Sequence, residues 1–116
     1  MSAKLPDNPK LADFQTYIKE IGRERGWDKN NYLEIFLLFG EEVGELAKAM
    51  RNRAGLYAEE AKQNDIYELE SEFADVFNYL LDLANVFDID LETAFRKKDA
   101  ENALRVWKSN SKKSDI

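Results

Sequence analysis

Residues 31–51, NYLEIFLLFGEEVGELAKAMR, contain the stretch around which the rest of the chain is organised. They begin with Asn31 and, three positions later, Glu34, a pattern typical of a capping box at the start of a helix. The run Ile35–Phe39 that follows is apolar on almost every side of a helix, so it must be covered on several sides. A chain this short offers few helices for that task, and a second copy of the chain is therefore expected to complete the core.

Acidic residues interrupt two of the apolar segments. They are Glu41, Glu42 and Glu45 in the first segment and Glu72 and Asp75, within EFAD, in the second. On a helix the first three fall within an arc of about 100° that apolar residues share, and the last two lie on one face. Burying like charges together costs several kcal/mol unless a positive group joins them. The sequence therefore predicts that two helices hold a hard divalent cation between them.

The composition narrows the chemistry of such a site. The 116 residues include no cysteine and no histidine, and the formal net charge is −6. Thiolate chemistry is excluded, and the commonest general base and transition-metal ligand is missing. Oxygen-only coordination suits Mg²⁺, Mn²⁺ or Ca²⁺. The acidic charge argues against a nucleic-acid polymer as partner, although it permits a single nucleotide that arrives with its metal.

The scarcity of turn-forming residues predicts an all-α fold, because the chain has only 5 glycines and 2 prolines. We expect one domain over residues 1–116, with a four-helix bundle core completed by homo-oligomerisation. The first expected helix runs from Pro9, after an Asn8 N-cap, to an end between Gly22 and Gly26, and the others run over about 31–51, 66–86 and 91–108. Residues 1–7 and 108–116 are expected to be loose tails, and 52–65 a loop with a helical turn near 57–63.

Apolar periodicity assigns inner faces to the last two helices. The third is expected to bury Phe73, Val76, Phe77, Leu80, Leu83 and Ala84. The fourth begins an inward face with Leu91, Ala94 and Phe95, and the same face continues through Lys98, Asn102 and Arg105. An inward face that turns cationic is expected to meet anions, either the acids themselves or phosphates on their metal. Asp82 and Glu92 are interpreted as surface residues.

The two acidic motifs, EExxE at 41–45 and ExxD at 72–75, resemble the signature of the MazG-like, all-α nucleoside triphosphate pyrophosphohydrolases. The likeness extends over roughly residues 27–107, through GELAKAMR, ADVFNYLLDLA and IDLETAF. It implies a four-helix core that forms a homodimer or a homotetramer. It also implies Mg²⁺-dependent hydrolysis of a (deoxy)nucleoside triphosphate to the monophosphate and pyrophosphate, as in house-cleaning of the nucleotide pool.

The resemblance further implies roles for individual residues. The metal-binding and catalytic acids are matched by Glu42, Glu45, Glu72 and Asp75, and Glu41 matches the first acid of the motif. Positions that contact phosphates are matched by Lys98, Asn102 and Arg105, and positions near sugar and base by Tyr79 and Trp27. With no histidine present, Glu42 or Glu45 would orient or deprotonate the attacking water.

Other interpretations stay open at this point. The substrate can instead be that of a phosphoribosyl-ATP pyrophosphohydrolase or a dUTP pyrophosphatase of the same superfamily. A different class is a non-catalytic helical oligomer or partner-binding bundle, with the acids solvated or paired with Lys98 and Arg105. The chain has no apolar segment typical of a signal peptide or a membrane span, which predicts a cytoplasmic protein.

Overall fold

The computed structural model describes residues 3–57 and 66–105, and within these ranges the chain is all-α, as predicted. The elements are α1 (Leu11–Arg25), the short 3₁₀ helix η1 (Trp27–Lys29), α2 (Tyr32–Ala54), α3 (Ile66–Val86) and α4 (Leu91–Leu104). None of the described helices is long and apolar enough to cross a membrane. The helical turn predicted near 57–63 and the tail predicted at 108–116 lie outside the described residues, except for Tyr57.

The helix ends follow local capping chemistry. The capping box predicted for α2 is confirmed: the Glu34 amide donates to Asn31 Oδ1 at 3.0 Å, and the Asn31 amide donates to Glu34 Oε1 at 2.8 Å. The start predicted for α1 at Pro9 is wrong, because the helix begins at Leu11 and the Asp13 carboxylate accepts from the Lys10 amide at 2.8 Å. α1 ends where Gly26 adopts a φ of 73°, which glycine tolerates without a steric penalty.

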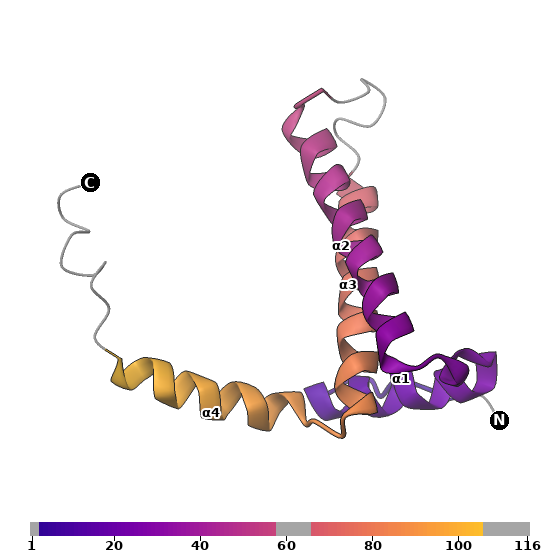
Figure 1. The fold of residues 1–116 in the computed structure, drawn as a ribbon, viewed down its shortest axis with the longest axis vertical. Helices are drawn as coiled ribbons and strands as arrows, with labels where there is room; N and C mark the ends of the chain where they lie inside the picture. Colours follow the sequence, from indigo (N-terminus) through magenta and orange to yellow (C-terminus); the bar gives the residue numbers. More distant parts are fainter. Residues whose placement is uncertain (1–2, 58–65, 106–116) are drawn as a thin grey trace.

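Two long helices form the body of the molecule. α2 and α3 run antiparallel, side by side, and pack more extensively on each other than any other pair of described elements (Figure 1). α1 crosses the foot of this hairpin, where α2 begins and α3 ends. The hairpin therefore carries the two acidic segments on neighbouring helices, as the sequence predicted.

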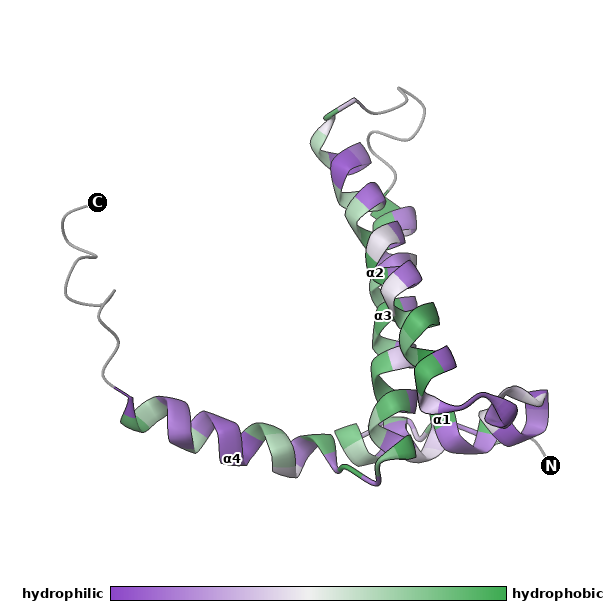
Figure 2. Cartoon of the chain, viewed as in Figure 1, coloured by the Kyte–Doolittle hydropathy of each residue, from purple (hydrophilic) through white to green (hydrophobic). Residues whose placement is uncertain are grey.

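The buried core of one chain is small. Among apolar residues only Ile21, Ile35, Ala49, Leu81 and Ala84 are buried in the described part of the chain. The face predicted for α3 is only partly right, because its buried strip runs through Leu81 and Ala84 while Phe73 and Leu80 are exposed. The hairpin covers only a narrow strip of α3, so much apolar surface stays uncovered, and Figure 2 shows hydrophobic segments along both long helices.

A buried glutamine fixes the path of the chain between α3 and α4. Gln15 on α1 donates from Nε2 to the Ile89 carbonyl at 2.8 Å and to Asn85 Oδ1 at 3.2 Å. Its Oε1 accepts from the Leu91 amide at 3.0 Å, at the first residue of α4. The turn is completed by Asp88, whose φ of 53° is left-handed.

After this turn α4 extends away from the hairpin (Figure 1). None of its residues is buried, and Phe95 is 72% exposed. The inward face predicted from Leu91, Ala94 and Phe95 is therefore wrong for a single chain. The physical reason is direction: α4 leaves the turn pointing away from the hairpin, and its main contacts are with α1.

Candidate metal and nucleotide site

Three carboxylates meet between the two long helices. Glu42 on α2 and Glu72 and Asp75 on α3 each place a carboxylate oxygen within 4.8 Å of the other two, and all three are partly buried. We call these three residues the acid cluster. Glu72 and Asp75 lie one turn apart on α3, so both can face one point on α2. The Glu72 Oε2 atom is buried and has no hydrogen-bond partner in the described part of the chain.

The electrostatics of the acid cluster are unfavourable in the absence of a cation. Burial raises the pKa of Glu42 above its usual value, and the negative charges of Asp75, Glu72 and Glu41 raise it further. The same field reaches one turn along α3, where burial and the charges of Glu42 and Asp75 raise the pKa of Tyr79. A positive charge at the centre of the cluster would offset both rises in pKa.

The donor set fits a hard divalent cation. Three carboxylates offer oxygen ligands only, which is the coordination that Mg²⁺ and Mn²⁺ prefer. The orphaned Glu72 oxygen supports this fit, because a buried polar atom without a partner costs about 1–3 kcal/mol. Such an atom is explained if it faces an ion.

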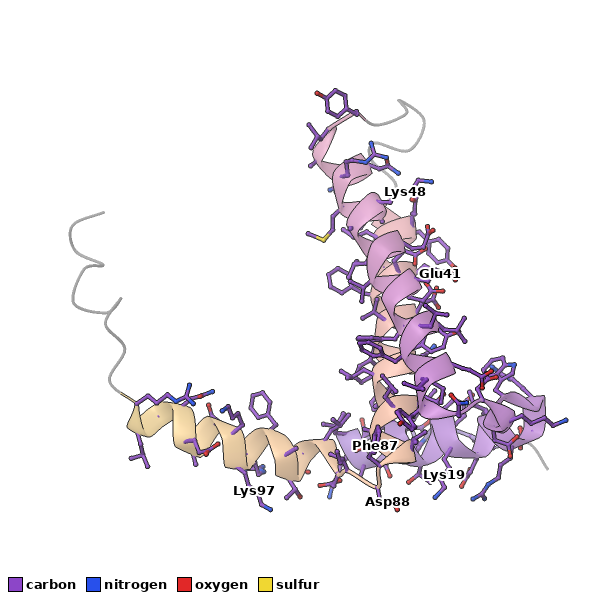
Figure 3. The ribbon with its side chains drawn as sticks, viewed as in Figure 1. Lys19, Glu41, Lys48, Phe87, Asp88 and Lys97 are labelled. Atoms are coloured by element: carbon purple, nitrogen blue, oxygen red, sulfur yellow. The ribbon has the colours of Figure 1, made fainter. Side chains whose placement is uncertain are left out.

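The other two predicted acids lie outside this group. Glu41 and Glu45 are exposed on α2, and neither belongs to the acid cluster in the part of the chain that the structure describes. Figure 3 labels Glu41 on the flank of α2, on the same side as Lys48. Their roles as ligands stay predictions.

A cavity of about 910 Å³ adjoins the acid cluster. Glu42 and Asp75 lie on its wall, and Tyr79 and Asp82 continue that wall along α3. The apolar part is formed by residues of α1 and α2, namely Phe14, Ile18, Ile21, Ile35 and Leu38. This volume lies within the usual range for small-molecule sites, about 300–1,000 Å³. The cavity thus extends from the carboxylates of α2 and α3 to an apolar wall on α1 and α2, and Lys19, Arg23 and Arg25 of α1 also line it.

Trp27 reaches the cavity from η1. Its side chain is 54% exposed, and the Arg25 guanidinium lies 4.9 Å from the centroid of its ring. An indole at the rim of an apolar cavity offers a flat surface on which a planar ring can stack.

The predicted phosphate-contacting residues lie elsewhere in one chain. Lys98, Asn102 and Arg105 are on or at the end of α4, and none of them lines the cavity. The Lys98 ammonium is 3.8 Å from the Glu101 carboxylate of its own helix. Figure 3 shows Lys97, next to Lys98, far along α4 from Glu41. A single chain therefore does not bring these residues to the acid cluster.

One cavity residue was missed by sequence reasoning. Asp82 was interpreted as a surface residue, yet it is half-buried and lines the cavity. The signal was present in the spacing, since Asp75, Tyr79 and Asp82 follow at intervals of four and three and so share one helix face.

Two comparisons with known proteins agree with this geometry. Residues 31–100, more than half of the chain, match the sequence profile of the MazG nucleotide pyrophosphohydrolase domain. The chain is also 37% identical over 87 residues to the uncharacterized protein YpjD of Bacillus subtilis (strain 168), covering 72% of this chain and 75% of that protein. The matched residues include the whole acid cluster and the part of the cavity wall that α2 and α3 form.

Proposed function

The chain belongs to the MazG nucleotide pyrophosphohydrolase domain family, and from this premise we propose that it hydrolyses a nucleoside triphosphate to the monophosphate and pyrophosphate with Mg²⁺. Family membership supports nucleotide pyrophosphohydrolase activity in general. The observation that carries the finer proposal is the acid cluster at the wall of a cavity of nucleotide size. House-cleaning of the nucleotide pool is the role that we assign to this activity.

The acid cluster would hold the metal and prepare the water. A divalent cation bound there supplies charge neutralisation for the triphosphate and makes a water molecule more acidic. Glu72 and Asp75 face this position from α3, and the partly buried Glu42 faces it from α2. The partly buried Glu42 carboxylate would orient the attacking water and accept its proton.

The cavity sets the direction of the nucleotide. Phosphates belong at the acid cluster because their charge requires the metal, and the base belongs at the apolar end. Tyr79 lies one turn from Asp75 and so borders the sugar, while Trp27 offers its ring to the base.

A second copy of the chain would complete the protein. Phe36 and Leu37 on α2 are 62% and 76% exposed, which is unusual for large apolar residues in the middle of a helix. A homodimer or homotetramer that covers this face also allows α4 of one copy to approach the hairpin of another. That arrangement would bring Lys98, Asn102 and Arg105 to the phosphates, where they would offset the charge of the departing pyrophosphate.

A substrate screen tests this proposal. The protein is incubated with Mg²⁺ and normal or modified dNTPs, dUTP and phosphoribosyl-ATP, and released pyrophosphate is detected. We expect release from at least one dNTP, and its loss in Asp75→Asn with the helical fold retained. Glu45→Gln tests the ligand role predicted for the exposed Glu45. No pyrophosphate from any nucleotide, together with no Mg²⁺ binding by calorimetry, would instead favour a non-catalytic helical oligomer.

A further inference from the structure

Asp82 is placed unusually for an aspartate on a helix surface. It is half-buried, it lines the cavity, and no hydrogen bond or ion pair joins its carboxylate to any other residue in the described ranges. Burial alone raises the pKa of its carboxyl group. A half-buried carboxylate that opens onto the cavity offers two acceptor oxygens to a ligand with N–H donors.

The level of Asp82 along α3 identifies the part of a nucleotide that it faces. Seven residues separate it from Asp75, which corresponds to about 10 Å along a helix axis. The distance from the α-phosphorus of a nucleotide to the hydrogen-bonding edge of its base is of the same order. Tyr79 lies between them at the level of the sugar, and the apolar residues Ile21 and Ile35 enclose the same end of the cavity.

We propose that Asp82 selects the nucleobase, favouring guanine and discriminating against thymine and uracil. The inference rests on the proposed function, because it takes the phosphates to lie at the acid cluster. A carboxylate has two acceptor oxygens and no donor. Guanine presents N1–H and N2–H side by side and satisfies both oxygens, whereas thymine and uracil present one N–H between two carbonyls, so an acceptor faces an acceptor. Cytosine and adenine, with one amino group beside a ring nitrogen, rank between these extremes.

Replacing one carboxylate oxygen of Asp82 with an amide NH₂ group reverses this complementarity. In Asp82→Asn the side chain keeps its shape but offers one acceptor and one donor, which matches N3–H and O4 of thymine or uracil. A well-formed bidentate pair discriminates between bases by about tenfold to a hundredfold. We therefore expect the ratio of kcat/KM for dGTP to that for dTTP to fall by about this factor in Asp82→Asn.

The matched control is Asp88→Asn. It removes the same charge just beyond the same end of α3, but Asp88 is exposed and lies outside the large cavity. Its left-handed backbone is one that asparagine tolerates well, so the turn should persist. We expect its dGTP-to-dTTP ratio to equal that of the unmodified protein. A merely structural role of Asp82 would lower kcat/KM for both substrates equally and leave the ratio unchanged.

Binding of dGMP and dTMP, measured by calorimetry in the presence of Mg²⁺, separates this proposal from the proposed function. If no triphosphate is hydrolysed but Asp82→Asn shifts the preference from dGMP toward dTMP, the selection by Asp82 stands and the proposed activity falls. If hydrolysis occurs and the ratio is the same in Asp82→Asn as in the unmodified protein, the selection by Asp82 is overturned alone. If neither nucleotide binds nor any is hydrolysed, both are overturned.

Discussion

Replacing Glu72 with glutamine should stabilise the metal-free protein while removing its activity. The side chain keeps its shape, but one of three clustered negative charges disappears, and the amide group can donate to Glu42 or Asp75. A variant that is more stable and less active is expected where like charges are kept close together in order to bind a ligand.

The magnitude follows from the spacing of the carboxylates. Two unit charges at the 4.8 Å limit of the acid cluster repel by about 0.9 kcal/mol in water and about 3.5 kcal/mol at an effective dielectric constant of 20. The site is only partly buried, so solvent screens part of this repulsion, and we expect a gain of about 1–3 kcal/mol. At about 4 °C per kcal/mol, the melting temperature should rise by about 4–12 °C.

The assay is urea unfolding at fixed protein concentration, with EDTA and then with Mg²⁺. The unmodified protein should gain stability from Mg²⁺, by about 2.7 kcal/mol at one hundred times the dissociation constant, and Glu72→Gln should gain far less. Glu70→Gln is the control, since Glu70 is exposed on the same helix and outside the acid cluster. A Glu72→Gln protein that is less stable than the unmodified one in EDTA, yet equally stabilised by Mg²⁺, would refute the reasoning.

Three further predictions concern pH, packing and assembly. Because the pKa of Glu42 is raised, the folded state binds a proton at Glu42 more tightly than the unfolded state does. The stability of the metal-free protein should therefore fall as the pH rises from 4.5 through the raised pKa. Urea titrations of Glu42→Gln should lack this fall in stability. Gln15→Ala should lower the free energy of unfolding, measured in urea, by about 2–3 kcal/mol. The substitution leaves the Leu91 amide without a hydrogen-bond partner, removes the hydrogen bond to the Ile89 carbonyl and leaves a cavity. A loss below 0.5 kcal/mol, about the size expected for a surface substitution, would contradict this prediction. Light scattering should give the mass of a dimer or larger assembly, and Phe36→Glu should shift it toward the monomer; a monomeric unmodified protein would contradict the proposed assembly.

Much of the fold could be predicted because local rules decide it. The Asn31–Glu34 capping box and the Asp90 N-cap place the starts of α2 and α4 where the sequence indicates them. The start of α1 was misplaced because Pro9 is only permissive for a helix start, whereas the hydrogen bond from the Lys10 amide to Asp13 fixes it.

The direction in which α4 leaves the turn after α3 could not be predicted in the same way. Periodicity shows that Phe95 shares a helix face with Lys98, but the turn held by Gln15 decides where that face points. Convergence of Glu42, Glu72 and Asp75 was predicted because residues one turn apart on a helix must share a face. Asp82 was missed because an acid on a helix is usually fully solvated, and only the cavity reveals that this one is half-buried.

Mn²⁺ binding followed by electron paramagnetic resonance tests directly whether the acid cluster holds a divalent cation. Free Mn²⁺ gives a sharp signal that is lost on binding, so titration yields the affinity and the number of sites. We expect the unmodified protein and Glu70→Gln to bind Mn²⁺ alike, Mg²⁺ to displace it, and Asp75→Asn to bind it at least tenfold more weakly. Equal Mn²⁺ affinity in Asp75→Asn and the unmodified protein would contradict the account.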